Sequence, residues 1–225
     1  MGAFLVFEGP EGGGKSSQAR ALAGRLDQMG YPVVLTREPG GTSLGDAIRQ
    51  ILLPASPLSI SPRSEALLYS ASRAQLVEEV IRPALERGQV VVSDRYSFST
   101  IAYQGYGRGL GAEAVAEVVE FGTCGLYPDL VILLDLDPRL GLERKRGELL
   151  AGVVEEWNRF EEEELAFHQR VREGYLAMAA SDPGRWVVLD ASLPFETLQD
   201  RIMREVSTLL GRRRVLRQRG DGRRG

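Results

Sequence analysis

Five short, almost wholly apolar runs constrain the fold of this chain more than any other feature of its sequence. They match strands that are buried on both faces of a sheet, and they cover Phe4–Glu8, Val33–Arg37, Val90–Asp94, Leu130–Asp135 and Trp186–Asp190. The amphipathic stretches between them predict helices over Lys15–Gly30, Ser43–Leu53, Pro62–Arg87, Ala112–Phe121, Arg159–Ala180 and Pro194–Leu210. This alternation predicts a three-layer α/β fold, in which helices flank a five-stranded parallel sheet.

The first three runs end in charged residues, which are Glu8, Arg37 and Asp94. The carboxyl ends of parallel strands lie at one edge of a sheet, and ligands bind at that edge. We therefore expect these side chains to meet around a ligand.

The chain is predicted to form one domain over residues 1–211, because 225 residues suit a single α/β core and no linker divides them. Residues 144–158 are charged and contain Gly147 and Gly152, which indicates a mobile lid rather than core. Residues 212–225 carry seven arginines and one aspartate, so we expect a disordered tail. An arm that contacts phosphate or RNA is the alternative for this tail.

Charge and cysteine content bear on partners and compartment. The formal net charge of −3 argues against nucleic acid as the main partner. Cys124 is the single cysteine, which excludes an internal disulfide framework and fits a reducing cytoplasm. No basic region precedes the apolar run at residues 4–7, and that run is too short for a signal peptide or a membrane span. We expect a cytoplasmic protein without a membrane segment.

The segment Gly9–Ser16 matches the pattern G-x-x-x-x-G-K-[ST] of a phosphate-binding P-loop, between a predicted strand and a predicted helix. Its glycines let backbone N–H groups turn toward phosphate oxygens, and the following helix adds its N-terminal partial positive charge. Lys15 can then reach the β- and γ-phosphates, and the Ser16 hydroxyl can bind Mg²⁺. The residues expected to bind ATP are Gly9, Pro10, Glu11, Gly12, Gly13, Gly14, Lys15, Ser16 and Ser17.

Two further strand ends carry groups that suit phosphate binding. Asp94 can hold the water shell of Mg²⁺, and Arg95 beside it can face phosphate, so we expect Lys15, Asp94 and Arg95 to be catalytic. Thr36–Thr42 contains a proline followed by two glycines, an irregular loop that can approach a ligand closely. Considered without the other motifs, Asp94 and Arg95 could be a surface ion pair, and Thr36–Thr42 could be an ordinary turn.

Together these motifs resemble those of bacterial thymidylate kinases, in the same order over residues 3–210. The matching segments are Phe7–Gly12 with Lys15, Thr36–Thr42, Asp94–Tyr96, Ala102–Gly105 with Gly107 and Arg108, Tyr127–Leu130 and Arg159–Glu161. Many families share the P-loop, whereas the combination of Arg-Glu-Pro-Gly-Gly, Asp-Arg-Tyr and Tyr-Gln-Gly is specific. The resemblance implies a P-loop NTPase fold and a homodimer. It also implies Mg²⁺-dependent transfer of the γ-phosphoryl of ATP to dTMP, giving dTDP and ADP for dTTP biosynthesis.

The resemblance further implies a dTMP site. Glu11 takes the place of the carboxylate that accepts from the 3′-hydroxyl of the deoxyribose. Arg73 and Gln104 match the residues that read thymine, which is chemically sensible because arginine donates to carbonyl oxygens and an amide can both donate and accept. The other residues expected to bind dTMP are Glu38, Arg49, Tyr69, Arg95, Ser99, Thr100 and Tyr103.

Some of these residues have particular implied roles. Arg49 and Arg95 correspond to residues that hold the phosphate. Tyr69 stands where the family usually has a phenylalanine that stacks on thymine, and tyrosine still permits stacking. Ser99 and Thr100 line the sugar and base pocket, and Tyr103 would lie near C2′, where its bulk disfavours a ribose hydroxyl. For Tyr69 core packing, and for Arg49 a solvated helix face, remain alternatives.

Phosphoryl transfer needs positive charge around the transferring group. Some members of the family supply an arginine from the P-loop, and others supply basic residues from the lid. The loop here has Glu11 and no arginine, so the resemblance implies the lid arrangement. The candidates are Arg144, Lys145, Arg146 and Arg159, and the sequence does not choose among them.

Two other functions stay open at this point. Another nucleoside or nucleoside-monophosphate kinase would share the P-loop, and so would a regulatory ATPase that binds a protein partner. Two residues receive structural interpretations: His168 is expected on a helix surface, and Cys124 is expected to be a small buried residue.

Overall fold

The computed structural model describes residues 2–54, 58–152 and 159–221. The described residues contain one sheet of five parallel strands, which are β1 (Ala3–Glu8), β2 (Val33–Arg37), β3 (Val90–Asp94), β4 (Leu130–Asp135) and β5 (Trp186–Asp190). The strand order is β2-β3-β1-β4-β5. The predicted α/β fold with a five-stranded parallel sheet is therefore confirmed, and each strand occupies the apolar run that predicted it.

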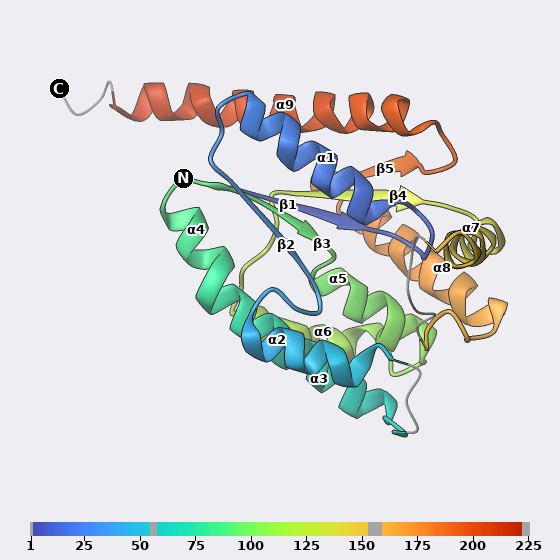
Figure 1. The fold of residues 1–225 in the computed structure, drawn as a ribbon. Helices are drawn as coiled ribbons and strands as arrows, with labels where there is room; N and C mark the ends of the chain where they lie inside the picture. Colours follow the sequence, from blue (N-terminus) through green and yellow to red (C-terminus); the bar gives the residue numbers. More distant parts are fainter. Residues whose placement is uncertain (1, 55–57, 153–158, 222–225) are drawn as a thin grey trace.

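The helical elements surround this sheet (Figure 1). They are α1 (Lys15–Gln28), α2 (Ser43–Leu52), α3 (Pro62–Leu76), η1 (Val77–Ile81), α4 (Arg82–Glu86), α5 (Ser97–Thr100), η2 (Ile101–Gly107), α6 (Ala112–Thr123), α7 (Pro138–Leu150), α8 (Leu165–Ser181) and α9 (Phe195–Asp221). The predicted helix from Pro62 to Arg87 is interrupted at η1, a π-helical turn just before Pro83. Proline lacks the N–H that a regular helix needs there.

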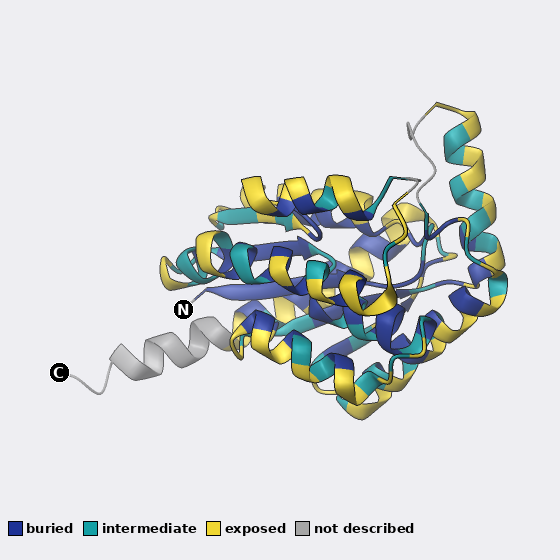
Figure 2. Ribbon diagram, turned by 90° about the horizontal axis from the view of Figure 1, so that it is seen from below, coloured by how far each residue is buried: buried dark blue, intermediate teal, exposed yellow. Residues whose placement is uncertain are grey.

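Alternation along β1 divides the core between two helix layers. Leu5 and Phe7 pack with α1 and α9 on one face of the sheet, whereas Phe4 and Val6 pack with α3, η1 and α4 on the other. On this second face, Leu133 of β4 packs with η2 and α8. Figure 2 shows the buried residues concentrated along the sheet, between the two layers. Because both faces are covered, ligands are left with the ends of the strands.

Three segments differ from the helices that we predicted. A helix, α7, occupies Pro138–Leu150, so the first part of the predicted lid is helical, and residues 153–158 of that lid lie outside the described residues. We predicted one helix from Arg159 to Ala180, but α8 begins only at Leu165, so the acidic run at 161–164 lies before the helix. The segment after β3, where we predicted no helix, forms α5 and η2. Its aromatic, β-branched and glycine residues have low helix propensity, but η2 packs against α8, and this tertiary packing stabilises the helix.

The last helix and two single residues also differ. α9 continues past Leu210 to Asp221, into the segment expected to be disordered, where arginine, leucine and glutamine favour a helix. His168 is buried, because the start of α8 is covered by the segment that precedes it. Cys124 is exposed, because it lies at the C-terminal end of α6 in a left-handed conformation with φ of 49°. The predictions for His168 and Cys124 were wrong. No helix that is described is long and apolar enough to cross a membrane.

Candidate functional site

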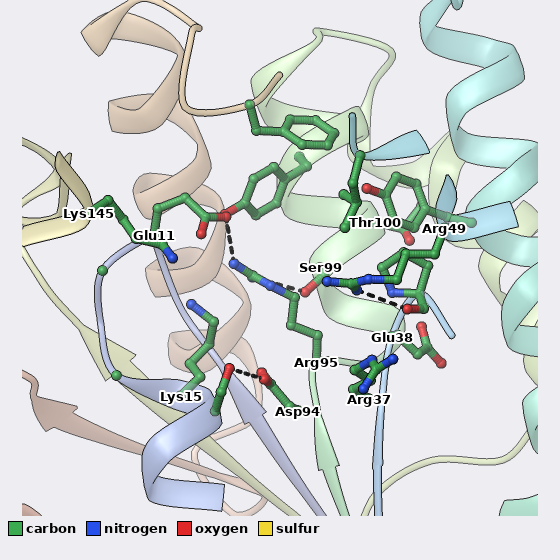
Figure 3. Close-up of a pocket in the computed structure, with 18 of the residues that line it drawn as sticks. Glu11, Lys15, Arg37, Glu38, Arg49, Asp94, Arg95, Ser99, Thr100 and Lys145 are labelled. Atoms are coloured by element: carbon green, nitrogen blue, oxygen red, sulfur yellow. Dashed lines mark hydrogen bonds and ion pairs between the residues drawn. The ribbon is translucent and has the colours of Figure 1, made fainter. Parts of the chain in front are cut away.

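A cavity of about 580 Å³ opens at the carboxyl ends of β1, β2 and β3. Most of the residues predicted to form the site line it: Glu11, Gly12, Gly14, Lys15, Ser16, Ser17, Glu38, Arg49, Tyr69, Asp94, Arg95, Ser99, Thr100, Tyr103, Gln104 and Lys145. Figure 3 shows their polar groups turned toward one space. Arg37, which was expected to meet a ligand at the end of its strand, also lines the cavity; the other lining residues, which were not predicted to bind a ligand, are Arg20, Pro39, Leu53, Glu148 and Phe160.

The P-loop joins β1 to α1, and its glycines are required by close backbone contacts. A Cβ on Gly9 would lie 2.4 Å from the Leu134 carbonyl oxygen, and a Cβ on Gly12 would lie 2.2 Å from the Gly141 carbonyl oxygen. Both glycines also have positive φ, of 141° and 71°. Neither position tolerates a side chain, so the loop keeps its backbone free to face a ligand.

Lys15 begins α1 and is buried. Its Nζ donates to the Pro10 carbonyl oxygen at 2.6 Å, which holds the side chain across the loop. Burial, with the positive charge of Arg95 nearby, lowers the pKa of Lys15 to about 8 against the attraction of Glu11 and Asp94. The positive charge of Lys15 is therefore only partly balanced by the neighbouring carboxylates, and a bound anion would stabilise the charged form.

The hydroxyl of Ser16 donates to Asp94 at the end of β3, beside Lys15 (Figure 3). Both side chains line the cavity. A serine oxygen and a carboxylate are hard oxygen donors, which Mg²⁺ prefers. The donor set thus fits Mg²⁺, the metal that the P-loop implies.

Arg95 is the centre of the hydrogen-bond network. Its guanidinium donates to the Glu11 carboxylate at 2.7 Å, and its other acceptors lie at 3.0 to 3.3 Å: Gly9 O, Ser99 Oγ, Tyr103 Oη and Tyr175 Oη. Arg95 has φ of 70°, a left-handed conformation that is uncommon for a residue with a side chain. Such strain clusters at functional sites, and here it aims the guanidinium into the cavity.

Glu11 is an ionised carboxylate within the P-loop. Burial would raise its pKa, but the positive charges of Arg95 and Lys15 and a hydrogen bond from Tyr103 hold the pKa at about 2. The Tyr103 hydroxyl donates to Glu11 at 2.7 Å. Glu11 can therefore act only as an acceptor at neutral pH.

Glu8 lies beneath this network and does not reach the cavity that Arg37 and Asp94 line. It is fully buried and accepts from the backbone N–H groups of Tyr96 and Ser99 and from the Tyr175 hydroxyl, at 3.0, 3.2 and 2.9 Å. Burial raises its pKa, against the charge of Arg95. The expectation that three strand ends meet around a ligand thus holds for two of them, and the third fixes the turn that carries Arg95.

Arg73 and Glu38 form a buried ion pair with 2.7 Å between Nη2 and Oε2. Arg73 also donates to Thr100 Oγ1 at 2.8 Å. Among the described residues, Nη1 of Arg73 and Oε1 of Glu38 are buried without a hydrogen-bond partner. Burial raises the pKa of Glu38 to about 7, although Arg73 opposes this. Arg73 itself does not line the cavity, but Glu38 and Thr100 do.

An aromatic wall, formed by Tyr69, Tyr103 and Phe160, lines part of the cavity. The rings of Tyr103 and Phe160 pack edge to face with centroids 5.4 Å apart, and the Tyr69 ring lies 6.4 Å from that of Phe160. Phe160 follows the predicted lid and lies in the matching segment Arg159–Glu161, but it was not predicted to bind a ligand. The wall suits a flat, apolar ring system.

Two more arginines stand at the β2 side of the cavity. Arg49 donates to the Pro39 carbonyl oxygen at 3.0 Å, and Arg37 lines the same wall. Burial and the nearby charge of Arg37 lower the pKa of Arg49. These two guanidinium groups form a second positively charged region at the cavity, and Arg95 lies between that region and Lys15 (Figure 3).

The structure separates the four lid candidates. Lys145 lines the cavity, 3.4 Å from Glu148 and 3.7 Å from Glu161. Arg144 donates to the Ala191 carbonyl oxygen at 2.9 Å, beyond β5, and Arg146 lines a second cavity with residues of α7 and the acidic run. Arg159 donates to the Leu52 carbonyl oxygen at 2.5 Å. Only Lys145 of the four lies at the main cavity.

Comparisons with known proteins point to one family. The thymidylate kinase family model matches residues 7–202. The chain is 51% identical over 209 residues to the thymidylate kinase of Roseiflexus castenholzii, covering 90% of this chain and 91% of that one. It is 49% identical over 209 residues to the thymidylate kinase of Deinococcus radiodurans, covering 92% and 97%.

A solved structure agrees with these sequence relatives. The crystal structure of thymidylate kinase from Ehrlichia chaffeensis superposes with a TM-score of 0.72 at 29% identity, covering 91% of this chain and 98% of that one. The similarity in sequence and in fold thus extends over nearly the whole chain. This chain belongs to the thymidylate kinase family.

Proposed function

We propose that the cavity binds ATP at the P-loop and dTMP against Arg95 and the aromatic wall, so that the γ-phosphoryl passes from ATP to dTMP. One observation carries this assignment. A single cavity carries positive charge at both ends, from Lys15 on the P-loop side and from Arg37 and Arg49 on the β2 side, with Arg95 between them (Figure 3). Two phosphate groups that face each other in this cavity would each meet positive charge.

The transfer needs no general base. An oxygen of the dTMP phosphate is already anionic and attacks the γ-phosphorus, while the bond from that phosphorus to the β-phosphate oxygen breaks and ADP leaves. Lys15 holds the β- and γ-phosphates, and Arg95 and Arg49 hold the acceptor. Catalysis is then positioning and charge stabilisation, without a covalent intermediate on the enzyme.

Mg²⁺ is the metal that this site fits. Ser16 and Asp94 would hold it, directly or through water, because both oxygens line the cavity beside Lys15. The bound ion would offset negative charge on the β- and γ-phosphates. In the absence of nucleotide, the contact between Ser16 and Asp94 keeps both donors in place.

The nucleoside would lie against the aromatic wall. Tyr69 and Phe160 offer faces for the base, and Glu11, ionised and held by Arg95 and Tyr103, would accept from the 3′-hydroxyl. The unpartnered Nη1 of Arg73 would donate to O4 of thymine, with Ser99 and Thr100 lining the sugar side. A buried polar atom without a partner requires an explanation, and a bound nucleotide would supply one for Nη1 of Arg73.

We further propose a cytoplasmic homodimer. Leu44 and Ile51 on α2, Leu67 on α3 and Phe121 on α6 are exposed large apolar side chains, and Phe121 is 91% exposed. Such residues on neighbouring helices suit a subunit interface. A monomeric mass by light scattering at micromolar concentration would contradict the dimer.

The division into a domain over residues 1–211 and a tail over 212–225 also remains a proposal.

A coupled ADP-release assay with dTMP, dUMP, AMP, GMP and CMP tests the proposed function. We expect dTMP to be the best acceptor. Lys15→Ala should lower kcat/KM by at least about 100-fold, which excludes a contaminating kinase. A preference for a purine monophosphate would instead support another monophosphate kinase. A regulatory ATPase would show no thermal stabilisation by dTMP alone, since a ligand stabilises only the state it binds.

Lys145→Ala should lower kcat for dTMP by about 100-fold, because Lys145 is the lid candidate at the cavity and a charge near the transferring phosphoryl is lost. Arg146→Ala is the matched control, since Arg146 is the next residue of α7 and lines the second cavity instead, and its kcat should change less than about threefold. Steady-state kinetics at saturating ATP and dTMP measures both. Equal losses in the two variants would mean that Lys145 has no special position.

ATP binding should weaken as the pH rises through about 8, where Lys15 loses its proton in the free enzyme. A lysine is charged below its pKa, so the dissociation constant should be flat near pH 7 and rise several-fold by about pH 9.5. Calorimetric titration without dTMP measures this. In Lys15→Arg the guanidinium stays protonated, so a rise that persists in this variant would assign the titration to another group.

A further inference from the structure

Glu65 is a buried carboxylate that phosphoryl transfer does not use. It lies on α3, its side chain is 1% exposed, and it does not line the main cavity. Gln104 Nε2 donates to its Oε1 at 2.6 Å. Its Oε2 lies 2.6 Å from Nη2 of Arg159, and Arg108 reaches both oxygens at 3.4 Å. One carboxylate thus holds an amide that lines the cavity and two guanidinium groups behind it.

The contact with Glu65 fixes the orientation of the Gln104 amide. An ionised carboxylate has no hydrogen to donate, so the amide group that faces Glu65 must be the NH₂. The amide is planar, and its oxygen points along the other arm. Gln104 lines the cavity, so the oxygen is the amide atom that remains for a ligand there.

Arg73 supplies the complementary group. Its Nε and Nη2 are occupied by Glu38, Thr100 and the Tyr96 carbonyl oxygen. Its Nη1 is buried without a partner among the residues described. Its acceptor Thr100 lines the cavity four residues before Gln104, so the Arg73 guanidinium lies behind the wall that carries the Gln104 amide.

We propose that Glu65 is a positioning residue that makes the base pocket select a ring edge with a carbonyl oxygen beside an N–H group. This inference rests on the proposed function and deepens it. Thymine presents O4 beside N3–H, which matches the pair. The 5-methylcytosine ring has the same shape but presents an amino group beside an unprotonated nitrogen. Its amino group would face the Arg73 donor, and its N3 lone pair would face the Gln104 oxygen, so neither hydrogen bond could form. Glu65 thus sets specificity without contacting the base.

Glu65→Gln tests the proposal, because an amide at position 65 can donate or accept and lets the Gln104 amide turn over. We expect the ratio of kcat/KM for dTMP to that for 5-methyl-dCMP to fall by about tenfold or more. For dTMP the loss should appear in KM, with kcat within about twofold of the wild type, because the groups that hold the two phosphates are not altered.

Glu163→Gln is the matched control. Glu163 also pairs with Arg108 but does not contact Gln104, so this variant should keep the wild-type ratio. A second control uses the Gln104→Met background, in which Glu65→Gln should cause no further change in the ratio. That result would show that Glu65 acts through the Gln104 amide and not through general packing.

Thermal unfolding of each variant checks that it is folded. Should Glu65→Gln not fold, Glu65→Asp replaces it; this variant keeps the charge for both arginines but withdraws the carboxylate from Gln104, so the same fall is expected. Three results would each overturn the proposal: an unchanged ratio, an equal fall in Glu163→Gln, or a further fall when Glu65→Gln is added to the Gln104→Met background. A wild-type enzyme that does not phosphorylate dTMP would overturn the proposed function instead.

Discussion

The ion pair between Arg95 and Glu11 ties two segments of the main cavity together. Glu11 belongs to the P-loop, and Arg95 belongs to the turn after β3. Each side chain is 15% exposed, so the pair is dry enough to be strong and open enough to meet a ligand. A movement of either segment would separate the groups proposed to bind ATP from those proposed to bind dTMP.

Maintaining Arg95 in this position requires a supporting layer. Its left-handed backbone costs on the order of 1 kcal/mol or more. Glu8 offsets that cost by binding the backbone of the next turn, while Tyr175 bonds both to Glu8 and to Arg95 from α8. Helix α8, which precedes the last strand, therefore supports a site built mainly from the first half of the chain.

The sequence predicted the parts of the molecule whose physics is local. Strands buried on both faces show continuous apolar runs, and the P-loop needs its glycines, Lys15 and Ser16 in a fixed order. Tyr175 and Glu65 escaped prediction because each acts on the site through long-range packing that no short pattern records. Phe160 lay in the matching segment Arg159–Glu161, but that segment alone did not show that the ring reaches the cavity. The lid shows the same limit. Once α7 is known to be a helix, Arg144, Lys145 and Arg146 must point about 100° apart, so only one can face the cavity.

The buried Nη1 of Arg73 and Oε1 of Glu38 have a consequence for the life of the protein in the cell. A buried polar atom without a partner lowers stability by about 1–3 kcal/mol, and a ligand that satisfies it returns that stability. The empty enzyme then opens more often than the occupied one, and proteases act on opened chains. Any ligand that satisfies these two atoms would thereby lengthen the life of the copy that binds it.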